Sequence, residues 1–292
     1  CRLEITGHDH GALIDGIPPL PGDERVGLFQ QIGHIYECKL RFSGSGGMPF
    51  EIKDDTFERQ SHGLAVKLLD ANGNTCHDFL FNNAPVFPSK EPRSALPAQE
   101  EDLDAGTIAA MDAVLKAASD PGQPLWMHQF SISAYAWGSH GAVKYGIQPA
   151  RPNDGYLSAP KQAAYEAILN GRGPNFRRDA LGYLVTHAER DIQLAFCVQF
   201  ADPNDDASHG CPIDDEEIEW KTPWYQVACI TISPQEGSLD PAEDDGLVFN
   251  SYHISSADHL PIGRLNRARL WAYKASAAAR HDNNAIAHSP HP

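Results

Sequence analysis

The residues whose types and spacing best suit a chemical role lie in the stretch 263–280. This stretch is rich in Ala and Leu and has no Pro or Gly after Gly263, so it predicts a helix. At about 100° per residue, Tyr273 lies about 40° and Arg280 about 20° from Arg269 around that helix. One face therefore carries a phenol and two guanidinium groups, and a guanidinium beside a phenol favours the phenolate.

A phenolate on this helix could bind ferric iron, because it is a hard anionic ligand and tyrosine serves as an axial haem ligand in proteins. Arg280 is spaced to reach an anion further along, such as a haem propionate. The alternative is a surface helix with solvated arginines and a half-buried tyrosine. On this stretch alone, that alternative is favoured.

Other candidate residues are ambiguous when taken singly. Asn82 and Asn83 follow a predicted strand and could orient a small oxygen species, or they could simply complete a turn. The loop sequence His8-Asp9-His10 could bind a metal through alternating imidazoles, or it could be an exposed polar loop. His140 follows Ser139 directly, and on a strand the two would face opposite sides, which is wrong for a nucleophile and its base.

Composition limits the classes of function. The formal net charge of −16 disfavours binding to nucleic acid or anionic membranes, and no apolar run approaches the roughly 20 residues of a membrane helix. Six cysteines form no C-x-x-C pair, so we expect reduced, mostly buried thiols and a cytoplasmic protein. The chain begins at Cys1 rather than Met, so we expect its true N-terminus to lie upstream.

The hydrophobic pattern predicts more strands than helices, joined mostly by short turns. Strands are expected at 1–6, 35–42, 63–69, 78–81, 192–200 and 225–233, with one or two more within 132–148. Helices are expected at 23–32, 103–118, 161–169, 177–187 and 263–280. The acidic run 202–219 is expected to be solvated. The fold class is therefore α+β, with an antiparallel sheet or barrel inside and helices outside, as one domain over 1–281 and a flexible tail over 282–292.

Several short motifs together resemble the catalase-like haem proteins. Arg41-Phe42-Ser43, His62-Gly-Leu-Ala-Val-Lys-Leu68, Asp78-Phe-Leu-Phe-Asn82-Asn83-Ala-Pro-Val-Phe87, Gly138-Ser139-His140 and Arg269-Leu-Trp-Ala-Tyr273 follow the order and spacing of the catalase core. The segments 218–224, 245–250 and 260–267 resemble the short catalase-related (mini-catalase) branch. The resemblance spans about residues 25 to 281. It implies an eight-stranded antiparallel β-barrel with surrounding helices that encloses haem b.

The resemblance assigns roles on the proximal side of the haem. Tyr273 would be the metal ligand, and Arg269 would keep it as the phenolate. His140 would sit on the same side and support Arg269.

It also assigns roles on the distal side and at the propionates. Asn82 would be the distal amide, Ser43 would hydrogen-bond the distal histidine, and Phe87 would be a distal-side aromatic. Arg41 and Arg280 would pair with the haem propionates.

The distal histidine of the family has two candidate positions here. Residues 1–6 resemble the strand that follows it, so it is expected to precede Cys1. The alternative is that His8, in His8-x-x-Gly11, is that histidine, but the spacing to Arg41 is then a few residues short. We favour the first, because residues 1–6 fit the first strand better than any segment after Gly11.

The sequence thus predicts a haem-dependent oxidoreductase that processes hydrogen peroxide or organic hydroperoxides, fatty-acid hydroperoxides included. Its expected partner is a small peroxide, with no nucleic acid and no membrane span, and a homo-oligomer is compatible with the resemblance. One alternative is a haem-binding or sensor protein without efficient peroxide turnover. A cofactor-free barrel that binds other proteins is a third reading, which the intact Arg269–Tyr273 spacing disfavours.

Overall fold

The computed structural model of the chain describes residues 1–7, 11–44, 61–88, 122–150, 155–202, 212–235 and 247–287. From residue 277 onward, the only side chain that it describes is that of Ala278. The predicted helix 103–118 and the His8-Asp9-His10 loop lie outside these residues.

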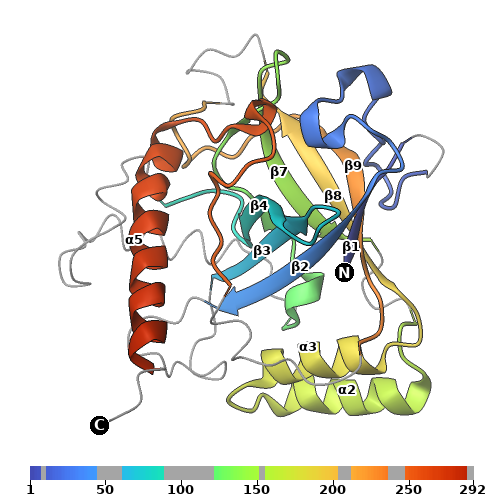
Figure 1. The fold of residues 1–292 in the computed structure, drawn as a ribbon. Helices are drawn as coiled ribbons and strands as arrows, with labels where there is room; N and C mark the ends of the chain where they lie inside the picture. The colour runs from blue at the N-terminus through green and yellow to red at the C-terminus, as the bar shows by residue number, and fades with distance from the viewer. Residues whose placement is uncertain are drawn as a thin grey trace.

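Eight antiparallel strands close into a barrel (Figure 1). They are β1 (Arg2–Ile5), β2 (Ile35–Gly44), β3 (His62–Leu69), β4 (Thr75–Asn82), β5 (Gln129–Phe130), β7 (Ala142–Pro149), β8 (Ile192–Phe200) and β9 (Trp224–Ile232). Their order is β5-β4-β3-β2-β1-β9-β8-β7, and the pairing of β5 with β7 closes the ring. The short β6 (Tyr135–Ala136) pairs with β7 outside this ring. The predicted eight-stranded barrel and the α+β class are confirmed.

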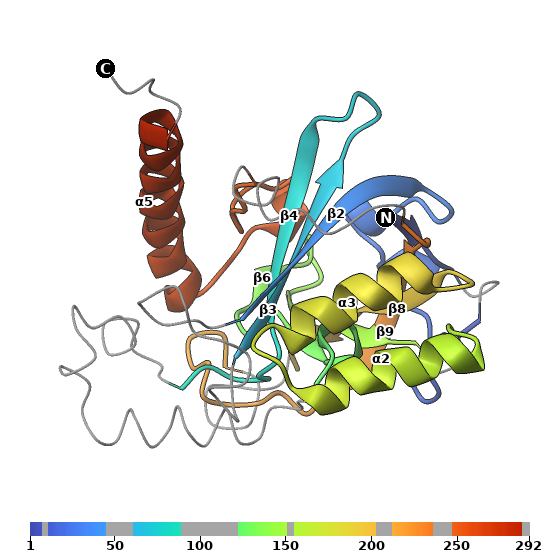
Figure 2. The ribbon, with the colours of Figure 1, turned by 90° about the horizontal axis from the view of Figure 1, so that it is seen from below.

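In the part of the chain that the structure describes, three α-helices pack outside the barrel, namely α2 (Ala159–Gly171), α3 (Phe176–His187) and α5 (Arg264–Ala287). Helices α2 and α3 form a pair on one side, whereas α5 stands on another side next to β2, β3 and β4 (Figures 1 and 2). The short 3₁₀ helices are η2 (Gly22–Glu24), η3 (Gly27–Phe29), η5 (Pro124–Trp126) and η6 (Ala257–His259). Among the described helices, none has both the length and the apolarity that crossing a bilayer requires.

Alternation along the strands divides the barrel wall into two faces. Leu64, Val66 and Leu68 of β3 are buried in the interior core, which Phe79 and Phe81 of β4 also join. The intervening residues of the same strands face outward. On β3 and β4, this outer face is the one that meets α5.

The sequence predicted a helix over residues 23–32, but in the structure this segment places the side chain of Phe29 in the hydrophobic core. Phe29 of η3 is fully buried and stacks on Trp137, with ring centroids 5.4 Å apart. The predicted helix is wrong because Arg25 and Val26 are extended, with φ of −87° and −133°, and so separate η2 from η3. Gly27, the first residue of η3, has a φ of +47°. A Cβ at Gly27 would also stand 2.7 Å from His259 Nε2, so only glycine lets η3 enter the barrel so closely.

Two further expectations need correction. Glu216 belongs to the acidic run that we expected to be solvated, yet it is buried, and burial raises the pKa of its carboxyl group. Helix α5 continues to Ala287, seven residues beyond the end of the helix expected at 263–280. The described cysteines, in contrast, are free thiols as expected, and Cys38, Cys197 and Cys229 are buried.

Candidate functional site

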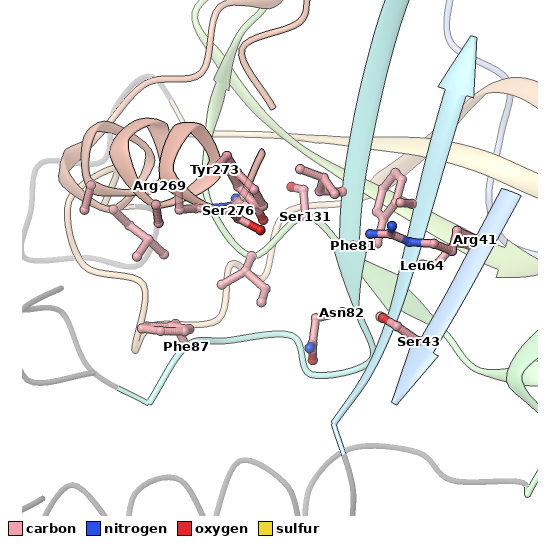
Figure 3. A pocket seen from close by; sticks show the side chains of 17 residues that line it. Arg41, Ser43, Leu64, Phe81, Asn82, Phe87, Ser131, Arg269, Tyr273 and Ser276 are labelled. Atoms are coloured by element: carbon pink, nitrogen blue, oxygen red, sulfur yellow. The ribbon is translucent and has the colours of Figure 1, made fainter. Parts of the chain in front are cut away.

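A cavity of about 470 Å³ lies between α5 and the outer face of β2, β3 and β4. Its size falls within the roughly 300–1,000 Å³ of known ligand pockets. Six of the eight predicted site residues line it: Arg41, Ser43, Asn82, Phe87, Arg269 and Tyr273. Figure 3 shows Arg269 and Tyr273 on α5, facing Asn82, Ser43 and Arg41 on the strands.

Strand register builds the first wall of the cavity. Residues directly opposite one another on neighbouring antiparallel strands share a face of the sheet. Two such rows cross the wall, Arg41–Ala65–Leu80 and Ser43–Gly63–Asn82. The residues predicted from separate motifs therefore meet because the strands pair in this register.

Helical spacing builds the opposite wall. The lining residues of α5 recur every three or four positions, which places them on one face: Leu265, Ala268, Arg269, Ala272, Tyr273 and Ser276. The helix begins after Gly263, where φ is +89° and a Cβ would stand 2.8 Å from the carbonyl oxygen of Ile213. The carboxylate of Asp214 accepts from the backbone N–H of Arg264 at 2.6 Å and so caps the first turn.

Arg269 and Tyr273 interact directly. Arg269 Nη2 donates to the Tyr273 hydroxyl oxygen at 3.2 Å, and Nη1 donates to Ser133 Oγ at 2.7 Å and to Asn266 Oδ1 at 3.2 Å. Burial alone lowers the pKa of the Arg269 guanidinium, but the phenols of Tyr273 and Tyr135 outweigh it and raise that pKa above its ordinary value. The guanidinium is therefore a fixed positive charge beside the Tyr273 oxygen.

The expected role of His140 is wrong. His140 is exposed in the turn between β6 and β7, where its backbone N–H donates to the carbonyl of Trp137 at 3.0 Å. Ser133 and Asn266 support Arg269 instead. The spacing of Asn266, three residues before Arg269, was visible in the sequence as a one-turn pair, whereas nothing there connected Ser133 to the helix.

Arg41 lies at the edge of the cavity, and its guanidinium is held by contacts with residues 247–249. Its Nη1 donates to the carbonyl oxygen of Leu247 at 3.1 Å, and its guanidinium lies 4.4 Å from the ring centroid of Phe249. The ammonium group of Lys67 lies 4.8 Å from the same ring. Phe249 thus contacts two cations and helps to fix the position of the Arg41 guanidinium.

A buried ion pair anchors the segment that carries Phe249. Lys67 Nζ and Asp78 Oδ1 are 2.7 Å apart, and the two side chains are 8% and 1% exposed. Asp78 Oδ2 also accepts from the backbone N–H of Asn250 at 3.0 Å. Through this carboxylate, β4 holds the segment over the outer face of the barrel.

Asn82 completes a local turn and also lines the cavity. Its Oδ1 accepts from the backbone N–H of Ala84 at 2.9 Å, which is the local turn, and its Nδ2 donates to Ser61 Oγ. The side chain nevertheless lines the cavity. An amide nitrogen has two hydrogens, so the bond to Ser61 leaves a second one for a molecule in the cavity.

Small side chains make room between the two walls. Gly63 and Ala65 lie on the strand wall and Ala268 and Ala272 on the helix wall. A Cβ at Gly63 would stand 2.7 Å from Ser43 Oγ, within the space of the cavity wall. With a phenol on one wall and an amide and a hydroxyl on the other, the cavity suits a flat group that carries a metal at its centre, and the donor set fits haem.

Two predicted residues cannot be placed in this cavity. Arg280 lies on α5, but its side chain is outside the described residues, and so is the whole of His8. No histidine is among the described residues that line the cavity. Within the described part of the chain, no group of three or more His, Cys, Asp or Glu side chains could hold a metal ion.

The fold is shared with solved catalase structures. A fungal catalase matches with a TM-score of 0.64 and 18% sequence identity, over 94% of this chain and 55% of that protein. Catalase A from Saccharomyces cerevisiae matches with a TM-score of 0.59 and 19% identity, over 94% of this chain and 57% of that protein. The chain therefore has the catalase-like fold and spans a little over half the length of these catalases.

At the level of sequence, no family model and no curated protein matches this chain. Because identity to the structural neighbours is below 20%, the likeness establishes the fold alone. A shared fold can host different functions, so function must be argued from the cavity.

Proposed function

We propose that this chain is a haem-dependent oxidoreductase that processes peroxides or hydroperoxides in the cavity between α5 and β2–β4. One observation carries the proposal: the Arg269–Tyr273 pair faces Asn82 and Ser43 across a single cavity. These residues come from segments far apart in the sequence. Their convergence supports a common role.

On the α5 side, Tyr273 would bind the haem iron through its hydroxyl oxygen. The guanidinium of Arg269 lies 3.2 Å away and favours the ionised phenol, which is the better ligand. Ser133 and Asn266 hold that guanidinium and so fix the direction from which its charge acts. Haem, when bound, supplies the redox-active iron at which a peroxide O–O bond is cleaved.

On the strand side, Asn82 would orient the peroxide. Its amide is fixed by Ala84 and Ser61, so its remaining N–H is directed without further loss of side-chain freedom. Ser43 offers a hydroxyl in the same row of the sheet, and Phe87 contributes an aromatic wall. Together they would hold a small polar molecule against an otherwise apolar surface.

At the edge of the cavity, Arg41 would pair with a carboxylate of the haem. The ring of Phe249 and the carbonyl of Leu247 orient its guanidinium in advance, which lowers the cost of fixing a long side chain. We assign Arg280 the same role further along α5. Guanidinium–carboxylate pairs are charge-assisted and geometrically selective.

Peroxide cleavage also needs a group that moves a proton, and an amide cannot do this near neutral pH. General acid–base help is worth about 10²–10⁴-fold in rate. No described residue that lines the cavity is a histidine, so we assign none of them to this step. His8 is the residue to test first. The same observation favours a second candidate function, a haem-binding or sensor protein with slow peroxide turnover.

The proposal is tested by loading the purified chain with hemin and adding either hydrogen peroxide or an organic hydroperoxide. Oxygen release or hydroperoxide loss well above that of free hemin is the expected result. If hemin binds but turnover stays at the level of free hemin, the sensor function is favoured. His8→Ala then tests that imidazole: if it is the proton carrier, turnover falls about 100-fold or more with hemin retained, and unchanged turnover means that the carrier is another group.

A further inference from the structure

Ile132 adopts a backbone conformation that β-branched residues rarely take. Its φ is +64°, in the left-handed region, and it lies in the connection between β5 and β6. The backbone N–H of Ser133 donates to the carbonyl oxygen of Ser131 at 2.7 Å, so residues 131–133 form a tight three-residue turn. A branched side chain in this region is strained, because its Cβ crowds the following carbonyl.

The surroundings of the turn hold it in place. Ser131 Oγ accepts from the backbone N–H of Tyr145 at 2.9 Å and donates to the carbonyl oxygen of Ser133 at 2.9 Å. Ser133 Oγ accepts from Arg269 at 2.7 Å and donates to Asn266 Oδ1 at 2.9 Å. Both serines are buried, so the turn is fixed on the barrel side by β7 and on the helix side by α5.

None of these hydrogen bonds requires a strained isoleucine at position 132. Ser131 and Ser133 make all of them, and glycine at position 132 would adopt the same backbone without a steric penalty. What glycine cannot supply is a side chain. The side chain of Ile132 is half-buried and lines the cavity, next in sequence to the serine that holds Arg269.

We infer that Ile132 is a binding residue whose side chain forms an apolar contact surface for the flat group that sits against Tyr273. The inference rests on the proposed function and deepens it, since it names a residue that seats the cofactor. Strain that persists at a cavity wall, where the neighbours determine the backbone, is typical of binding sites. The turn directs the apolar side chain into the cavity and, one residue later, directs a hydroxyl to Arg269.

The first measurement compares two variants in the absence of any ligand. At ordinary positions alanine is more stabilising than glycine, but at a left-handed position the order reverses. We expect the melting temperature of Ile132→Gly to exceed that of Ile132→Ala by about 2–4 °C. Arg172, which has a φ of +42° at the end of α2, is the matched control and should show the same order. An Ile132→Ala variant that melts at or above Ile132→Gly would refute the strain.

The second measurement uses hemin and iron-free protoporphyrin as probes. Ile132→Gly and Ile132→Ala should both bind each probe about tenfold more weakly than the parent chain, which corresponds to about 1.4 kcal/mol of lost contact. Ile132→Val, which keeps the branched side chain, should restore most of the affinity, and the two Arg172 variants should bind like the parent. Tyr273→Phe should impair hemin but not protoporphyrin, because only hemin offers iron to the phenol.

The outcomes separate this inference from the proposed function. If the parent chain binds hemin through Tyr273 and the Ile132 variants bind both probes equally well, the inference is wrong and the proposed function stands. If the parent chain binds neither probe, both are wrong. Weaker binding by Ile132→Gly and Ile132→Ala alike, together with the reversed melting order, supports the inference.

Discussion

The Nη2 atom of Arg269 lies 3.2 Å from the hydroxyl oxygen of Tyr273, one turn along the same helix. The same guanidinium reaches across to Ser133 in the connection between β5 and β6. Helix α5 is therefore tied to the barrel by the side chain that also touches the proposed iron ligand. Removing the Arg269 side chain should therefore reduce both the stability of the fold and the binding of a ligand at Tyr273.

Replacement of Arg269 tests this double role. Arg269→Leu leaves Ser133 and Asn266 without their charged donor in a buried site, which should cost about 2–4 kcal/mol of unfolding free energy. Arg267→Leu is the control, because Arg267 is exposed on the same helix. Urea unfolding of the ligand-free chain measures both. Equal stability of the two variants would contradict the role of Arg269 as a tie between helix and barrel.

Gly63 provides a test of the strand wall. The added Cβ of Gly63→Ala would meet Ser43 Oγ at 2.7 Å and push that hydroxyl out of its place. We expect hemin affinity to fall about tenfold, equivalent to about 1.4 kcal/mol. The double variant Gly63→Ala/Ser43→Ala removes the clash and should recover part of the loss. Gly171→Ala is the control, because no atom lies within 4 Å of a Cβ at that position. A Gly63→Ala variant with unchanged affinity would show that this wall does not touch the ligand.

Breaking the buried ion pair Lys67–Asp78 should lower the free energy of unfolding far more than breaking an exposed ion pair does. Asp78→Ala leaves a buried ammonium group unpaired and releases the backbone N–H of Asn250, at a cost of about 3–5 kcal/mol. Glu189→Ala breaks the exposed pair with Lys161 and should cost far less, because solvent screens exposed charges. Denaturant unfolding compares them. Similar losses in the two variants would mean that Asp78 does not anchor the segment that positions Arg41.

Buried histidines predict how stability depends on pH. Burial lowers the pKa of His259 to about 4, and burial also lowers the pKa of His77 well below its ordinary value. His259 Nε2 accepts from the backbone N–H of Leu28 at 3.0 Å, a bond that protonation would break. The unfolded state takes up the proton near pH 6.5, so stability is full above that pH and falls as pH decreases towards about 4.

The loss from His259 alone should be on the order of 3 kcal/mol, since one pKa unit corresponds to about 1.4 kcal/mol. Melting temperatures between pH 7 and pH 4 measure it. His259→Gln should flatten this dependence of stability on pH. A stability that stays constant down to pH 4 would contradict this prediction.

Hydrophobic alternation predicted an antiparallel sheet or barrel, whereas the eight strands and most residues of the cavity wall were expected from the resemblance to catalase-like proteins. Alternation marks β3 and β4, and the pairing of Ser43 with Gly63 and of Gly63 with Asn82 then brings separate motifs together. Helical spacing alone aligns Arg269 with Tyr273.

What the sequence could not show depends on contacts between distant segments. An isoleucine gives no sign of a left-handed backbone, so the turn at Ile132 was not foreseen. The support of Arg269 was assigned to His140, which is exposed, because nothing local indicates that Ser133 lies under α5. In the same way, Phe249 and Asp78 position Arg41 from segments about 170 residues apart in the chain.

Hemin binding to Tyr273 is the decisive point. The ligand-free chain is titrated with hemin, and the absorption spectrum is compared with those of Tyr273→Phe and of Tyr183→Phe, which alters a tyrosine on α3 away from the cavity. We expect one hemin per chain, phenolate–iron bands in the parent and in Tyr183→Phe, and loss of hemin or of those bands in Tyr273→Phe. A Tyr273→Phe variant with the hemin content and spectrum of the parent would show that Tyr273 is not the ligand.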